Sequence, residues 1–70
     1  MVMNAQITTE YELLDTAEAA KVIGISPQTL RTWRHEQREG QPAFLKHPGG
    51  LVKYPRSSLD KYIADNMKSH

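Results

Sequence analysis

The chain has 70 residues, enough for one small domain, and its formal net charge is only +1. It contains no cysteine, which excludes disulfides and thiolate–metal sites, and no apolar run approaches the ~20 residues that a membrane-spanning helix needs. We therefore expect a soluble, cytoplasmic protein that folds around a modest hydrophobic core.

Charge is distributed unevenly along the chain. Residues 1–30 contain four acidic residues and one lysine, a net charge of −3. Residues 31–56 contain six basic residues and two glutamates, a net charge of +4, and the remaining residues are neutral overall. A positive central segment is what a phosphate backbone would meet, although chance clustering on a solvated surface gives the same pattern.

The first helix is expected to follow a flexible N-terminal arm at residues 1–12. The folded domain then covers residues 13–66, and residues 67–70 form a tail. Two caps are open for this helix: Thr16 alone, or Asp15 in a capping box with Glu18 three residues later. Gly24 suits the left-handed position that ends a helix. The residues expected to face inward are Ala17, Ala20 and either Val22 or Ile23.

A second helix is predicted from Pro27 to about Glu36. Ser26 is a favourable cap, and proline at the first helical position loses no hydrogen bond. The short segment 24–26 between the helices contains a glycine, as is typical of a helix-turn-helix. Leu30 and Trp33 lie on one side of this helix and are expected to pack against the first helix.

The opposite side of the second helix is polar and cationic, which suits reading of base edges in a major groove. By bidentate geometry Arg31 favours guanine and Gln28 favours adenine. Free N–H groups near Thr29 are suited to hold a phosphate. A solvated helix face is the alternative, and Arg34 and Arg38 are either phosphate contacts or solvated charges. The candidate contacts in this helix and just after it are Pro27, Gln28, Thr29, Arg31, Thr32, Arg34, His35 and Arg38.

A β-hairpin is expected after a polar loop at residues 36–42. Two β-favouring runs, residues 43–46 and 51–54, flank His47-Pro48-Gly49-Gly50. Alternation places Val52 and Tyr54 on one face of the second strand. The hairpin and its flank supply further candidate DNA contacts: Lys46, His47, Gly49, Lys53 and Arg56. The alternative is that these charges only prevent the exposed strands from pairing with other chains.

A third helix is expected to open with a capping box of Ser57 and Asp60, and its apolar stripe contains Leu59, Tyr62 and Ile63. The fold class is therefore α+β, mostly α, with a helix-turn-helix, a two-stranded wing and a closing helix. The predicted core consists of Leu14, Ala20, Ile23, Ile25, Leu30, Trp33, Phe44, Val52, Tyr54, Leu59 and Ile63.

Catalysis finds little support in the sequence. His35, His47 and His70 lack the spacing of metal ligands. The serines beside Asp60 are explained by a helix cap, and the glycine pair lacks the strand–loop–helix setting of a phosphate loop. We expect no enzyme activity, no cofactor, no metal and no small-molecule substrate.

Four segments in this order, Leu14–Ala20, Ile23–Ser26, Thr29–Trp33 and Tyr54–Asp60, resemble the excisionase-like winged helix-turn-helix family. That family is related to the DNA-binding domain of mercury-resistance-type regulators, and the likeness covers roughly residues 13–64. The chain departs from relatives at Leu51, where they often have a polar residue, and in the longer, more acidic loop after the second helix.

The resemblance implies that double-stranded DNA is the partner. The helix from Pro27 then enters the major groove while the hairpin touches the adjacent minor groove or backbone. In the first helix we add Thr16 and Lys21 as candidate contacts, although Lys21 could be an ordinary surface lysine.

Family members include excisionases, which bend DNA and direct an integrase, and small phage-type transcription regulators. We expect an excisionase of a phage or integrative element that works with a cognate integrase and with further copies of itself bound cooperatively. A transcription regulator of the same fold and a protein-interaction adaptor that no longer binds DNA are the alternatives.

Overall fold

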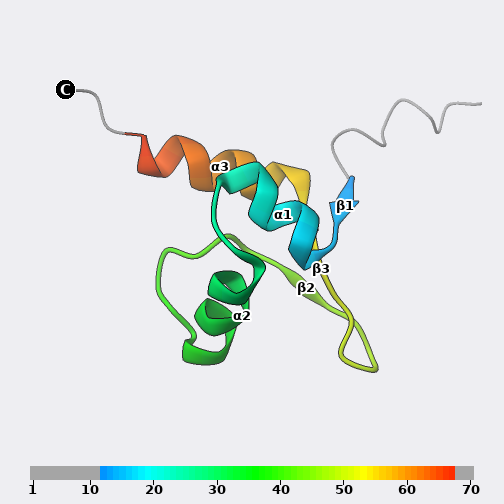
Figure 1. The fold of residues 1–70 in the computed structure, drawn as a ribbon. Coiled ribbons are helices and arrows are strands. Elements are labelled where there is room, and N and C mark those ends of the chain that lie inside the picture. The colour runs from blue at the N-terminus through cyan, green and yellow to red at the C-terminus, as the bar shows by residue number, and fades with distance from the viewer. Residues whose placement is uncertain (1–11, 68–70) are drawn as a thin grey trace, which may run out of the picture.

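The computed structural model describes residues 12–67, and the described chain folds into three helices and a three-stranded antiparallel sheet (Figure 1). This arrangement confirms the expected mostly helical winged helix-turn-helix. None of the helices in this range is long and apolar enough to cross a membrane. The elements are β1 Leu13–Leu14, α1 Thr16–Ile23, α2 Pro27–Glu36, β2 Leu45–Lys46, β3 Val52–Pro55 and α3 Arg56–Asn66.

Helix α1 begins with a full capping box. The Asp15 side chain accepts a hydrogen bond from the Glu18 backbone N–H (2.8 Å), and the Glu18 carboxylate accepts one from the Asp15 backbone N–H (3.0 Å). Of the two caps left open by the sequence, Asp15 is therefore the correct one, and Thr16 is the first helical residue. Gly24 ends the helix in the left-handed conformation, with φ of 83°, as predicted.

Helix α2 has the predicted start and length. The Ser26 hydroxyl accepts a hydrogen bond from the Thr29 backbone N–H (3.1 Å), and Pro27 occupies the first helical position. The helix ends at Gln37, which adopts a left-handed φ of 54° although it is not glycine. The Arg38 N–H then donates to the Trp33 carbonyl (3.0 Å), which satisfies one of the last helical acceptors.

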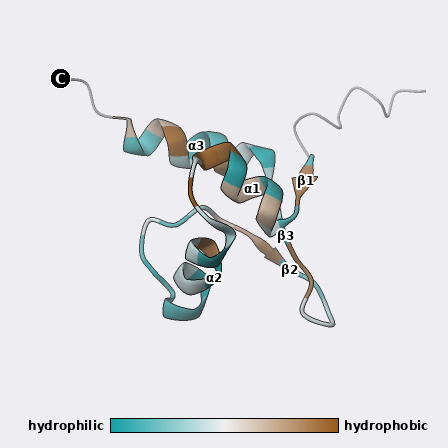
Figure 2. Ribbon diagram, in the orientation of Figure 1, coloured by the Kyte–Doolittle hydropathy of each residue, from teal (hydrophilic) through white to brown (hydrophobic). Residues whose placement is uncertain are grey.

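The core forms where α1, α2, α3 and β3 meet. Figure 2 shows hydrophilic residues on α2 and along the loop that follows it, and hydrophobic residues in β1. The buried residues of the hydrophobic core are Leu14, Ala19, Ala20, Leu30, Tyr54 and Leu59. Partly buried residues that pack against them are Val22, Ile23, Ile25, Trp33, Phe44 and Val52.

Two core predictions were wrong. Ala17 is exposed and Ala19 is buried in its place, because α1 contacts α2, α3 and β3 and its buried face is set by all three neighbours. Ile63 is only half-buried and lies outside the core cluster. The choice between Val22 and Ile23 also disappears, because both side chains pack against the core.

The sheet has a strand that the sequence did not predict. Strand β3 lies in the centre, with β1 and β2 antiparallel on either side. The Arg56 N–H donates to the Glu12 carbonyl (2.8 Å), so Glu12 extends the pairing beyond β1 although the sequence placed it in the arm. The rest of the predicted arm, and the predicted tail beyond Met67, lie outside the described residues.

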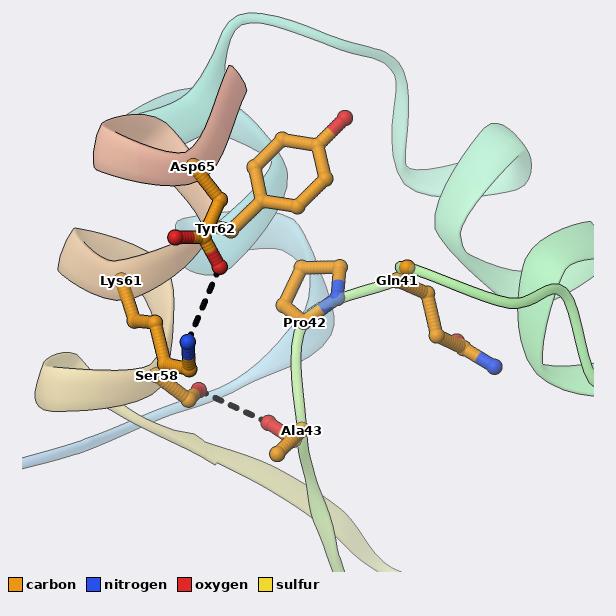
Figure 3. Close-up of a pocket in the computed structure, with 8 residues that line it drawn as sticks. Gln41, Pro42, Ala43, Ser58, Lys61, Tyr62 and Asp65 are labelled. Carbon is orange, nitrogen blue, oxygen red and sulfur yellow. Dashed lines mark hydrogen bonds and ion pairs between the residues drawn. The ribbon is translucent and has the colours of Figure 1, made fainter. Parts of the chain in front are cut away.

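Helix α3 begins earlier than predicted, and the expected capping box of Ser57 is wrong. Pro55 is the N-cap and makes no side-chain cap bond. Asp60 instead pairs with Arg56 one turn earlier (3.5 Å). The Ser58 hydroxyl donates to the Ala43 carbonyl (2.7 Å) and ties the segment before β2 to α3 (Figure 3). The proline sets the backbone angle that turns the strand directly into a helix.

Candidate nucleic-acid interface

The outer face of α2 presents polar side chains along one stripe. Gln28, Arg31 and His35 are exposed and Thr32 is half-buried, while Leu30 on the opposite side is fully buried. Arg31, Thr32 and His35 follow Gln28 by three, four and seven residues, so all four lie on one side of the helix. The division between an anchored side and an exposed side is as predicted, and base contact by the exposed side remains a prediction.

A hollow connects this stripe to the hairpin. Arg31 and Arg34 line it from α2, residues 15–17 line it from the start of α1, and Gly50–Val52 line it from the hairpin. In Figure 1 both α2 and the hairpin extend to the side of the molecule away from α3. One concave surface therefore includes the exposed arginine of α2 and the hairpin, which lie far apart in the sequence.

The hairpin is shorter than predicted but has the expected turn. Strand β2 covers only Leu45–Lys46, and the His47 N–H donates to the Leu51 carbonyl (2.7 Å). Gly49 and Gly50 both have φ of 89°, a conformation that side chains with a Cβ rarely adopt. These glycines are thus required by the turn itself, and they leave a narrow tip without side chains.

The predicted basic cluster around the hairpin is divided in space. Lys46 pairs with Val52, so the two side chains share one face of the hairpin, but Lys46 itself does not line the hollow. Lys53 pairs with Leu45 and points to the other face. Arg56 is engaged with Asp60 at the start of α3. His47 is half-buried at the turn and Gly49 is exposed at the tip. Of these cations, Lys46 is the most accessible, because it is exposed whereas Lys53 and Arg56 are half-buried.

Two arginines, one in α2 and one just after it, have different surroundings from those expected. Arg38 is exposed, but its guanidinium lies over the Trp33 ring, 5.1 Å from the centroid. Trp33 was expected to pack against the first helix. Its ring also packs on Tyr62 of α3, with 5.9 Å between the ring centroids. Arg34 is half-buried and hydrogen bonded within the protein, so it is not a solvated charge.

Several peripheral candidates also differ in position. The Thr29 N–H is used by the Ser26 hydroxyl and is not free for a phosphate. The Thr16 hydroxyl accepts a hydrogen bond from Arg34 and is therefore turned inward. Lys21 is exposed beside a second shallow hollow that Pro27 also lines, away from Arg31. The exposed stripe of α2 and the hollow that Arg31 lines are thus the part of the predicted site that the structure brings together.

Comparison with protein families matches residues 13–67 to the helix-turn-helix domain. The chain belongs to the helix-turn-helix domain family. It is a DNA-binding helix-turn-helix protein, and α2, the second helix of the motif, occupies the position of a recognition helix. A comparison with curated proteins finds no match.

The sequence did not reveal the roles of two residues near this surface. Gly50 lines the hollow beside Arg31, and the buried Tyr54 hydroxyl accepts a hydrogen bond from Arg34 (3.0 Å). The alternation of β3 correctly placed the Tyr54 ring inside the protein. No local pattern indicates which polar group a buried hydroxyl will meet, because that partner comes from a helix 20 residues away.

Proposed function

We propose that α2 enters the major groove of double-stranded DNA and that the hairpin follows the adjacent backbone or minor groove. Gln28, Arg31, Thr32 and His35 then face base edges, where Arg31 forms a bidentate contact to guanine. Lys46 meets phosphate from the hairpin. The observation that supports this proposal is the shared hollow, which brings Arg31 and residues 50–52 to one concave surface.

We infer further that the protein is an excisionase of a phage or integrative element. A module of this size covers only ~600–1,000 Å² of protein surface on DNA, which is small for tight specific binding. Adjacent copies of the protein, or an integrase on the same DNA, supply the missing affinity. Bending a site costs roughly 1–6 kcal/mol, which repeated phosphate contacts from several copies can offset.

The first experiment tests DNA binding itself. The DNA flanking the gene is footprinted with the protein, and affinity for the protected duplex and for a scrambled duplex is measured from low to high salt. Phosphate contacts lower log K linearly with log salt concentration, by ~0.9 for each phosphate neutralised. If the protein binds neither duplex, even at low ionic strength, the proposal is contradicted and an adaptor that binds protein is favoured.

The second experiment tests the excisionase role. A cognate integrase is given a supercoiled excision substrate with and without the protein, and circular product is quantified. Product that depends on the protein, together with a phased array of footprints, supports the excisionase. A single footprint over a promoter, with excision unchanged, supports instead a small phage or mobile-element transcription regulator of the same fold.

A further inference from the structure

Arg34 is half-buried at the point where three elements meet. Its Nη1 donates to the Thr16 hydroxyl at the start of α1 (3.2 Å) and to the Tyr54 hydroxyl of β3 (3.0 Å). Its guanidinium also lies over the rings of Phe44 and Tyr54, 5.8 and 6.0 Å from their centroids. Within residues 12–67, neither of the two ion pairs involves Arg34, so hydroxyls and aromatic rings hold this cation.

These contacts restrain the orientation of α2. A guanidinium is planar and directs its donors along fixed lines, so two acceptors on different elements define both its position and its tilt. The aromatic rings add an attraction that depends on the same geometry. Because Thr16 belongs to α1 and Tyr54 to the strand that forms the hairpin, Arg34 links the recognition helix to both.

We propose that Arg34 is a positioning residue, which fixes the distance between Arg31 and the hairpin and makes no phosphate contact of its own. The inference rests on the proposed function of the α2 surface. Arg31 and Arg34 line the same hollow, yet Arg31 is exposed and Arg34 is half-buried. Two arginines one turn apart therefore have different tasks: Arg31 reads the DNA, and Arg34 sets the angle at which Arg31 is presented.

Tyr54 allows this role to be separated from direct contact. Its side chain is fully buried, so it cannot touch DNA, and Tyr54→Phe removes only the hydroxyl that accepts from Arg34. A change in base selectivity in this variant must reach the DNA through the position of α2. Thr16→Val removes the second acceptor of the Arg34 hydrogen bonds. If one of Tyr54→Phe and Thr16→Val fails to fold, the other still tests the proposal.

The experiment measures affinity for the footprinted and the scrambled duplex, and the salt dependence of each, for Arg34→Lys, Arg34→Gln, Tyr54→Phe and Thr16→Val. Each variant is expected to lower the ratio of specific to scrambled affinity by about threefold to tenfold, the effect of one lost hydrogen bond. For Tyr54→Phe, whose side chain is fully buried, affinity for the scrambled duplex and the salt slope should stay as in wild type. Lys46→Ala is the contrasting variant, because it should weaken both duplexes and lower the slope by ~0.9.

Ile63→Val controls for stability. Ile63 is half-buried on α3 outside the core cluster, so this variant should lower the melting temperature without changing selectivity. The inference is overturned if Arg34→Gln lowers the salt slope by ~0.9 with equal loss on both duplexes, since that result identifies a phosphate contact. It is also overturned if the Tyr54 and Thr16 variants keep full selectivity. Absence of binding by the wild-type protein would instead refute the proposed function.

Discussion

Replacement of Arg31 by alanine separates base reading from general attraction to DNA. Arg31 is exposed on α2, and among residues 12–67 its side chain makes no hydrogen bond or ion pair. Alanine is the best helix former, and surface substitutions of this kind change stability by less than about 0.5 kcal/mol. The folded fraction should therefore be unchanged, and any loss of affinity comes from the interface.

The size of that loss follows from the contact that Arg31 is proposed to make. A bidentate arginine–guanine pair contributes about 1–3 kcal/mol of discrimination, which corresponds to roughly 5-fold to 150-fold in affinity. Affinity for the footprinted duplex should fall by this factor, whereas the scrambled duplex should lose only the smaller contribution of one positive charge. Preference at a single base pair should relax at the same time.

Fluorescence anisotropy with both duplexes at fixed salt measures the effect, and a set of duplexes substituted at each position locates the base. Arg31→Lys is the matched control, because it keeps the charge and loses the two-pronged geometry. It should retain binding to the scrambled duplex and lose preference for the specific one. Equal losses on both duplexes for Arg31→Ala would refute the assignment of Arg31 as a base reader.

The remaining predictions concern the hairpin and the anchored side of α2. Lys46→Ala should weaken binding to all duplexes and lower the salt slope by ~0.9. Lys53→Ala should have a smaller effect on affinity and on the slope, because Lys53 points to the other face of the hairpin. Equal slopes for the two variants would contradict this ranking. Trp33→Ala should lower the free energy of unfolding by about 2–3 kcal/mol in urea titrations, below the ~3–5 kcal/mol of a fully buried aromatic because Trp33 is half-buried. Gly49→Ala should cost about 1–2 kcal/mol through its φ of 89° alone, since nothing lies within 4 Å of the added Cβ; an unchanged melting temperature would show that the turn accommodates the side chain.

The local signals in the sequence predicted most of the helical part of the fold. Ser26 and Pro27 gave the start of α2, and Gly24 gave the end of α1, because caps and helix ends depend on residues within one turn. The same reasoning failed at Ser57, where a plausible capping box was replaced by a start at Pro55. A strand that runs directly into a helix removes the turn in which the serine could have capped.

The candidate site was predicted in part. Helical spacing alone places Gln28, Arg31, Thr32 and His35 on one face, away from Leu30. The sequence analysis assigned Arg34 to a phosphate contact or to solvent, because the sequence does not show that the Thr16 and Tyr54 hydroxyls lie beside it in the fold. It also grouped Lys46 with Lys53, since both are basic residues of one hairpin, whereas the strand register separates them onto opposite faces.

The sequence by itself thus determined which segments become helices, where α1 and α2 end, and which stripe of α2 is polar, because these properties depend on backbone preferences and on periodicity over a few residues. Only the tertiary structure decided the pairing of β1 with β3, the choice of Ala19 over Ala17 for the core, and the burial of Arg34. Each of these depends on groups brought together from distant parts of the chain, so the physical cause lies in packing that no local window contains.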